Sequence, residues 1–272
     1  MRLIVSLVLL VCFTACTRYN DINDFRFRSL EDGNALKITA YVGTSQTVRI
    51  PPRIRRVPII SIGEGAFLEK KLTSVSIPKG IISIEQGAFA RNRLTDISIP
   101  NSVTRIENWA FIGNQLNSIN IPNSVIFLSG FSENQLNSIN IPNSVTTIGF
   151  QAFWANLLTS ITIPNSVTNI QSWAFSDNVL NSVSIPDGVN FIGYGAFARN
   201  RLTDITIPNS VTEINRWAFT DNPLLRITIG ENVDIDMEAF GGNGFESVYA
   251  DSGRMAGTYT RPDQFSNVWT RQ

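Results

Sequence analysis

The sequence predicts an α/β solenoid of about nine stacked coils, in which each coil has about 22 residues and contributes one short parallel strand. Three columns of residues carry this prediction. Ile-Pro pairs recur every 22 residues, Ala-Phe pairs recur with the same period, and an asparagine stands three residues after nearly every one of these phenylalanines. The period shortens to 20 residues once, between Pro122 and Pro142. We therefore expect one continuous repeat domain rather than separate globules.

Each repeat begins with a segment that predicts a short β-strand. In residues 94–99 the side chains of Ile97 and Ile99 alternate with Ser98, which places both isoleucines on one face. Pro100 has no N–H group to give to a strand ladder, so the strand is expected to stop there. The Pro-Asn-Ser, Pro-Lys-Gly and Pro-Asp-Gly sequences that follow in different repeats are typical of turns.

The second half of each repeat predicts a loose leg that ends in a helical or 3₁₀ turn. Val103 and Ile106 are three residues apart and are followed by Ala110 and Phe111. One unit has too few apolar side chains to offset the conformational entropy of its ordered backbone. A unit is therefore expected to fold only when neighbouring coils share its core.

The asparagine column is expected to form a hydrogen-bonded ladder between coils. A turn buried between coils has backbone N–H and C=O groups that need partners, and an Asn amide both donates and accepts. The alternative is that these asparagines are ordinary polar surface residues. The column consists of Asn92, Asn114, Asn134, Asn156, Asn178, Asn200, Asn222 and Asn243.

Composition excludes several kinds of chemistry. The chain has no histidine, and its two cysteines, Cys12 and Cys16, precede the repeats, which removes His-dependent triads, Cys nucleophiles and the usual zinc sites. Basic and acidic residues both number 22, and a neutral chain is a poor partner for nucleic acid. Asp96 and Asp204 face away from the core but lie about 24 Å apart at strand spacing, too far for a glycosidic pair. We expect no catalytic residue, metal or cofactor.

The N-terminus predicts export. A short basic start precedes an apolar run from Leu3 to Phe13, which is too short to span a bilayer and is typical of a secretory signal. The sequence Phe-Thr-Ala-Cys at 13–16 resembles the lipobox of bacterial lipoproteins, although Phe13 stands where that motif usually has Leu. The resemblance implies cleavage before Cys16 and attachment of lipid to that cysteine. The alternative is an ordinary secreted protein with a leftover cysteine.

The repeat Leu-x-x-Ile-x-Ile-Pro-x-x-Val-x-x-Ile-x-x-x-Ala-Phe-x-x-Asn resembles the BspA-like leucine-rich repeat, also called the Treponema pallidum type. The resemblance covers roughly residues 48–248. It departs from the family in its final Asn, where Cys is frequent, and in deletions before Phe131 and Phe240 that are expected to dent the array. It implies a curved, right-handed leucine-rich repeat array with a strand-lined concave face. Members of the family are commonly exported bacterial surface proteins implicated in adhesion to host matrix or to other cells.

The chain is divided into four parts: residues 1–15 as a lipoprotein-type signal peptide, 16–47 as a tether and N-terminal cap strands, 48–248 as the solenoid and 249–272 as a C-terminal cap. Residues 35–41 resemble the N-terminal strand of the family. Phe245 and Val248 are expected to start a final strand. Apolar cover for the last coil is expected from Met255, Tyr259, Phe265 and Trp269.

Two sets of side chains are candidates for a binding surface. A polar row on the strands faces away from the core and includes Asn120, Asn140, Thr162 and Thr206. An aromatic set consists of Trp109, Trp173 and Trp217, which directly precede Ala-Phe pairs, and the nearby Trp154. Other repeats have glycine at that position, which is therefore expected outside the tight core, and Trp is enriched at binding hot spots. The alternatives are a merely solvated strand row and tryptophans that pack across neighbouring coils.

Together these features predict a non-enzymatic, exported lipoprotein that recognises a protein or glycan ligand, such as a host matrix or cell-envelope protein. Its lipid is expected to hold it in the bacterial cell envelope, at the outer membrane or the cell surface. The second hypothesis is a periplasmic or envelope scaffold lipoprotein without a host ligand.

Overall fold

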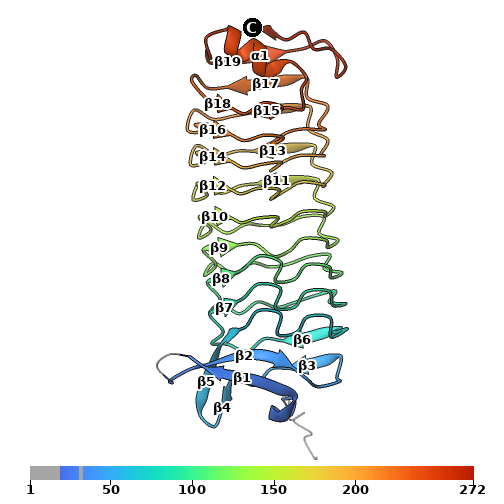
Figure 1. Ribbon diagram of the computed structural model, residues 1–272, viewed down its shortest axis with the longest axis vertical. Helices are drawn as coiled ribbons and strands as arrows, with labels where there is room; N and C mark the ends of the chain where they lie inside the picture. Colours follow the sequence, from blue (N-terminus) through green and yellow to red (C-terminus); the bar gives the residue numbers. More distant parts are fainter. Residues whose placement is uncertain (1–18, 31–32) are drawn as a thin grey trace, which may run out of the picture.

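The computed structural model describes residues 19–30 and 33–272, which form one elongated solenoid with its N- and C-terminal segments at opposite ends (Figure 1). The N-terminal end consists of the short 3₁₀ turn η1 (Ile22–Asp24) and the antiparallel strands β1 (Phe25–Ser29) and β2 (Leu36–Tyr41). A hairpin of β4 (Arg53–Ile54) and β5 (Val57–Ile62) follows, and β5 pairs with β2. The buried rings at the ends of β1 and β2 close this end of the core.

A continuous parallel sheet runs along one side of the solenoid, with one two-residue strand in each coil after β5. Paired residues such as Ile84 and Ile106 are 22 positions apart, and the single 20-residue step joins Leu128 to Ile148. The fold class and the repeat period predicted from the sequence are confirmed. The strands are β7 (Ser83–Ile84), β8 (Arg105–Ile106), β9 (Phe127–Leu128), β10 (Thr147–Ile148), β12 (Asn169–Ile170), β14 (Phe191–Ile192), β16 (Glu213–Ile214) and β18 (Asp234–Ile235).

Strands of the Ile-x-Ile-Pro segments form only in part. Residues 94–99 of one such segment form no strand. In two other segments, Asn120 and Asn140 pair only through an isolated bridge. In Figure 1 these segments lie on the other side of the solenoid from the continuous sheet. The parallel pairs are β3 (Thr47–Arg49) with β6 (Ser74–Ser76), β11 (Ser160–Thr162) with β13 (Ser182–Ser184), and β15 (Asp204–Thr206) with β17 (Arg226–Ile229).

The continuous sheet lies in the half of the repeat that the sequence predicts to be loose. Val103 belongs to a β-turn, because its N–H donates to the carbonyl oxygen of Pro100 at 3.0 Å. The chain then extends through β8, so the three-residue spacing of Val and Ile reflects a turn followed by a strand. The predicted 3₁₀ pattern is present in the next turn, where the N–H of Ala110 donates to the carbonyl oxygen of Glu107 at 3.3 Å.

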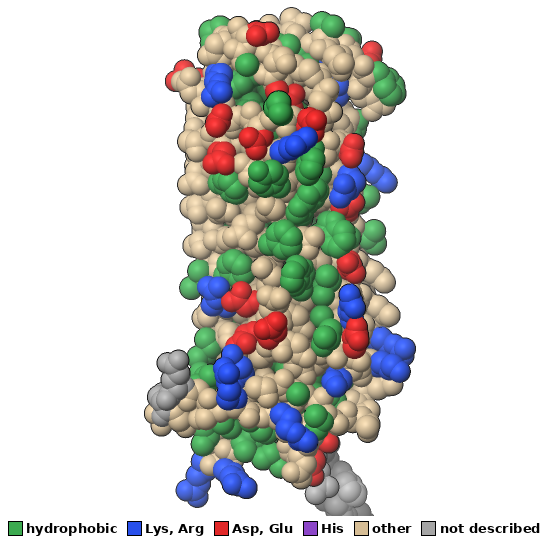
Figure 2. Space-filling view, viewed as in Figure 1, with side chains coloured by type: hydrophobic (Ala, Val, Ile, Leu, Met, Phe, Trp, Pro, Cys, Tyr) green, Lys and Arg blue, Asp and Glu red, His purple; other side chains and the backbone are tan. Residues whose placement is uncertain are grey.

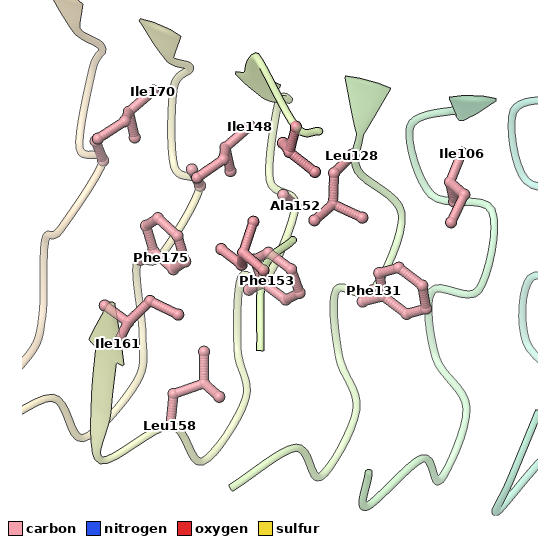
Figure 3. Packing of buried hydrophobic residues seen from close by; sticks show 14 of the residues in the cluster. Ile106, Leu128, Phe131, Ile148, Ala152, Phe153, Leu158, Ile161, Ile170 and Phe175 are labelled. Atoms are coloured by element: carbon pink, nitrogen blue, oxygen red, sulfur yellow. The ribbon is translucent and has the colours of Figure 1, made fainter. Parts of the chain in front are cut away.

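The phenylalanines of the Ala-Phe column stack ring upon ring through the core. Successive ring centroids from Phe67 to Phe240 lie 4.9–6.0 Å apart, at interplanar angles of 7–20°. Aliphatic side chains from both sides of each coil, such as Ile148, Leu158 and Ile161, surround the stack and are buried (Figure 3). Every coil therefore buries its apolar face against the coils on either side.

The two-residue deletion is absorbed within one turn. Gly130 has φ of 94°, and a Cβ at this position would lie 2.6 Å from the carbonyl oxygen of Glu107. Phe131 keeps its place in the stack, 5.3 Å from the ring of Phe111 and 6.0 Å from that of Phe153. Strands β8, β9 and β10 stay in register. The expected dent is thus confined to a turn.

The asparagine column joins the backbones of adjacent coils. Nδ2 of Asn156 donates to the carbonyl oxygens of Phe131 in the preceding coil and Phe153 in its own coil, at 2.9 and 3.2 Å. Its Oδ1 accepts from the N–H of Leu136 at 3.0 Å. The same bonds recur from the first member of the column to the seventh. One side chain per coil thus satisfies three backbone groups that the core hides from water.

The C-terminal end is closed by a helix rather than by the predicted final strand. In α1 (Phe245–Asp251), Phe245 packs edge-on against Phe240 with the ring centroids 4.8 Å apart. Asn243, the last member of the column, accepts the N–H of Phe245 through Oδ1 at 3.1 Å. The prediction of a strand here is wrong because Phe245, Val248 and Tyr249 follow helical spacing and share the face that covers the last coil.

Two strands complete this end. β19 (Gly257–Thr260) pairs with β17, and β20 (Thr270–Arg271) pairs with β19. Of the four side chains expected to cover the last coil, Tyr259 and Trp269 are buried, whereas Met255 and Phe265 are exposed and the prediction is wrong for them. Residues 19–30 and 33–272 contain no helix that could span a lipid bilayer.

Candidate functional site

The residue before each Ala-Phe pair, here called the slot, has a left-handed backbone in all eight described coils that contain it. This region of φ favours glycine, because the Cβ of an L-residue crowds the backbone at a cost of roughly 1–2 kcal/mol. Glycine therefore fits the slot because it adopts this positive φ without strain. Each tryptophan in the slot has a strained backbone conformation. The slots have φ of 57° at Gly65, 59° at Gly87, 60° at Trp109, 52° at Gln151, 60° at Trp173, 58° at Gly195, 62° at Trp217 and 61° at Glu238.

Trp173 lies across the glycine slot of the next coil. A Cβ added to Gly195 would be 2.3 Å from two carbons of the Trp173 ring. The ring centroid of Trp173 is 6.3 Å from that of Trp217, two coils further on. The guanidinium groups of Arg199 and Arg216 lie 5.5 and 4.7 Å from the rings of Trp173 and Trp217 respectively. Trp173 thus packs across neighbouring coils and still keeps part of its surface in contact with solvent.

Trp109 reaches across the shortened coil. Its Nε1 donates to Oε1 of Gln151 at 2.8 Å, and its ring packs edge-on against Phe150 with the centroids 6.0 Å apart. Gln151 occupies the next slot, because the deletion removes the slot of the coil between them. The deletion therefore makes room for this indole, as Gly195 does for Trp173.

Trp154 is held by an acidic residue of the next coil. Its Nε1 donates to Oδ2 of Asp177 at 2.6 Å, and Asp177 also accepts from Ser176 Oγ at 2.7 Å and from Arg199 Nε at 2.6 Å. Burial alone would raise the pKa of the Asp177 carboxyl, but the hydrogen bonds from Arg199, Ser176 and Trp154 outweigh it and hold the pKa below its ordinary value. Because Arg199 also stacks on Trp173, this ion pair links two of the tryptophans.

Trp217, the last tryptophan in a slot, is bonded to Glu238 in the slot of the next coil. Nε1 of Trp217 and Nη2 of Arg216 both donate to Oε2 of Glu238, at 2.9 and 2.8 Å. The hydrogen bonds from Arg216 and Trp217, together with the charge of Arg216, lower the pKa of the Glu238 carboxyl. Trp217 is 37% exposed. Its ring is thus fixed in orientation and open to solvent.

These side chains form one surface, here called the lateral aromatic face. Apolar side chains run lengthwise along the middle of the view in Figure 2, with charged side chains along its right side and toward both ends. Tyr194 adds a ring that is 46% exposed. The face is defined by Trp109, Phe150, Trp154, Trp173, Tyr194 and Trp217.

A recess lies beside Trp109, where two successive slots hold glycine. Its volume is about 540 Å³, and Gly65, Gly87, Leu68, Ile112 and Trp109 are among the residues that line it. A Cβ at either glycine would have no neighbour closer than 3.9 Å. The space is therefore a result of the residues in these slots, since the backbone is the same as in the tryptophan coils.

The other predicted residues lie elsewhere. Asn120, Asn140, Thr162 and Thr206 are exposed on the side of the solenoid that carries β11 and β15, away from the continuous sheet (Figure 1). The asparagine column is interior, so its amides bind backbone groups. Cys16 lies outside the described residues. Among residues 19–30 and 33–272 there is no group of three or more Cys, Asp or Glu that could hold a metal ion.

The comparisons with known proteins match both the sequence and the fold. The family described as the BspA type leucine rich repeat region matches residues 60–131 and 126–246, in six copies. None of the curated proteins compared with the sequence matches it.

The solved structures that resemble the fold include two bacterial leucine-rich repeat proteins. A leucine-rich repeat protein from Bacteroides ovatus is 20% identical with a TM-score of 0.56, and the match covers 79% of this chain and 66% of that chain. A leucine rich cell surface protein from Faecalibacterium prausnitzii is 22% identical with a TM-score of 0.50, and the match covers 82% of this chain and 73% of that one. This chain thus spans slightly less than two thirds of the first of these proteins, and at such identities the likeness concerns the fold.

Proposed function

Since the chain belongs to the BspA-type leucine-rich repeat family, we propose that it is a non-enzymatic recognition protein of the bacterial cell envelope. Its lateral aromatic face would bind a protein or glycan on the cell surface, with adhesion as the biological outcome. The similarity to a cell surface protein of another bacterium supports this location.

The strained tryptophans carry the proposal. Trp109, Trp173 and Trp217 each occupy a left-handed slot in which other coils place glycine without loss of the fold. Because the same fold forms with glycine in this slot, backbone strain kept at a tryptophan is a reason to look for function. Indoles whose N–H groups are bonded to Gln151 and Glu238 are also rigid, which lowers the entropy lost on binding.

The slot itself supplies the test. Trp173→Gly and Trp217→Gly replace each ring with the residue that the slot accepts in Gly65, so the backbone relaxes while the face is lost. We expect both variants to lose at least tenfold in affinity for the ligand captured from a panel of purified matrix proteins and glycans. The matched control is Phe265→Ala, which removes an aromatic ring that is 85% exposed at the C-terminal end.

Circular dichroism and melting curves separate binding from folding. Variants that melt with the wild type and fail to bind support the proposal. Variants that bind the captured ligand as tightly as the wild type overturn the assignment of this face.

The membrane anchor is proposed at Cys16, on the resemblance of residues 13–16 to a lipobox. Metabolic labelling with a radioactive fatty acid should mark the wild type and not Cys16→Ala. Protease shaving of intact cells distinguishes a surface protein from an envelope scaffold that faces the periplasm. An unlabelled wild type would exclude the anchor.

A further inference from the structure

The two ends of the solenoid differ in charge although the whole chain is neutral. Residues 19–80 include ten basic and six acidic residues, whereas residues 228–272 include three basic and seven acidic ones. Basic side chains gather at the end of the molecule in Figure 2 where Figure 1 places β1, β4 and β5. The molecule is therefore positive at its N-terminal end and negative at its C-terminal end.

The β4–β5 hairpin presents three exposed arginines at this end. Its two-residue tip consists of Arg55 and Arg56, with φ of 46° and 75°, which is the pattern of a type I′ turn. Such turns favour Asn-Gly, so two arginines hold a strained backbone at an exposed tip. Neither arginine, nor the exposed Arg53 beside them, forms an ion pair with a carboxylate of the described residues.

The same end carries further exposed groups. Arg26 and Arg28 are exposed on β1, at the edge of the sheet. The aromatic and aliphatic side chains of Tyr19 and Ile22 are 54% and 42% exposed. One nearby acid, Asp21, is engaged at the start of η1, where Oδ1 accepts the N–H of Asn23 at 2.8 Å. Exposed basic and apolar side chains at one end are suited to the interfacial region of a lipid bilayer. There arginine binds lipid phosphate and the tyrosine ring lies at the level of the headgroups.

The chain fixes this end close to the proposed anchor. Asn20 is bonded to the solenoid twice, because its N–H donates to the carbonyl oxygen of Arg49 at 3.1 Å and its Oδ1 accepts the N–H of Arg49 at 2.7 Å. Three residues lie between Cys16 and Asn20. The four steps along the chain from one to the other span at most about 14 Å. A lipid on Cys16 would therefore hold the basic end near the headgroups, within about two Debye lengths at physiological salt.

We propose that the N-terminal end of the solenoid is a docking surface for an anionic phospholipid bilayer, bound through Arg55, Arg56 and the basic residues around them. This docking rests on the proposed location in the cell envelope but not on the lipid itself. It holds the solenoid upright, with the acidic C-terminal end directed away from the negatively charged surface and the lateral aromatic face free along its length.

Vesicle binding tests the surface separately from the anchor. The mature chain from residue 16 onward, with Cys16→Ser so that it carries neither leader nor lipid, is added to vesicles of phosphatidylcholine and phosphatidylglycerol at three to one, and to vesicles of phosphatidylcholine alone. We expect sedimentation with the anionic vesicles only, and release at high salt. Arg55→Gln/Arg56→Gln should weaken binding about 25-fold, at roughly fivefold for each arginine.

The control removes two arginines elsewhere. Arg93→Gln/Arg201→Gln makes the same change of charge at two exposed positions within the repeats and should bind as the unmodified Cys16→Ser chain does. Melting curves of both double variants verify the fold.

Three results would overturn the proposal: no binding to anionic vesicles, equal losses in the two double variants, or equally tight, Arg55- and Arg56-dependent binding to heparin. Fatty-acid labelling of the wild type reports on Cys16 alone, so a failed anchor and a failed docking surface give different results.

Discussion

The Ala-Phe column and the slot that precedes it are neighbours in the chain and follow opposite rules. From Phe67 to Phe240 the column keeps the same aromatic residue in every coil, and its rings lie in one unbroken stack. The adjacent slot holds Gly, Trp, Gln or Glu on an almost constant backbone. Buried positions such as the Phe column thus hold the same residue in every coil. Because the interior is constant, residues on the lateral surface vary without a change in the fold.

The largest effect should come from the interior. Phe153→Ala removes one ring from the middle of the stack and should lower the free energy of unfolding by about 3–5 kcal/mol. Urea denaturation followed by circular dichroism measures it. If the loss were below about 1 kcal/mol, the stack would not be the source of stability that the comparison assigns to it.

A pair of glycine substitutions compares two slots with the same backbone. Gly65→Ala should cost about 1 kcal/mol, because only the left-handed φ opposes it. Gly195→Ala should cost a further 1–3 kcal/mol or so, since the new methyl group would meet the ring of Trp173. The two melting curves give the difference, and tryptophan fluorescence should shift in the second variant alone. Equal melting temperatures would contradict the packing of Trp173 over this slot.

The asparagine column is interior but polar, and its loss should have an intermediate effect on stability. Asn156→Ala leaves the carbonyl oxygens of Phe131 and Phe153 without this donor, which should lower stability by about 1–3 kcal/mol. Asn143→Ala, at an exposed turn, is the matched control and should leave the melting curve within about 0.5 kcal/mol of the wild type. Indistinguishable effects of the two changes would argue against the ladder.

The smallest effect should come from loss of the Asp177 carboxylate on the lateral aromatic face, either by mutation or by protonation at low pH. The pKa of Asp177 is lowered in the folded chain, so its contribution to stability is present above the ordinary value of 3.8 and is lost as the pH falls through the lower folded value. Because Arg199 and Asp177 are partly solvated, Asp177→Asn should cost only about 0.5–1 kcal/mol at pH 7. The gap between variant and wild type should close below pH 4, and a gap independent of pH would exclude the ion pair as its cause.

The sequence predicts the fold well because the columns identify the residues that face the core. Spacing alone gives the period, the Phe column and the single parallel array. It does not place the continuous sheet, because strands of two residues such as β8 are too short for apolar and polar positions to alternate. Spacing also fails to predict α1. Phe245 and Tyr249 lie beyond the last repeat, and one helical turn of apolar spacing is too short to distinguish a helix from a strand.

The candidate surface is less predictable for a different reason. Glycine at positions 65, 87 and 195 indicates a left-handed slot, but tryptophan in the same column conceals that signal. The partners of the indoles, Gln151, Asp177 and Glu238, stand at positions with no fixed residue in the repeat. Only the geometry of adjacent coils brings them together.

The turn at Gly130 has a consequence for how such a chain changes over generations. Residues 114–125 and 134–145 on either side of this turn are identical. Unequal recombination between the gene segments that encode them could add or remove one unit. Because a coil two residues short keeps its register, the junctions left by such events need not be perfect. Each unit gained would lengthen the solenoid by about 4.8 Å. The distance between its two ends would then be set by the inherited number of repeats.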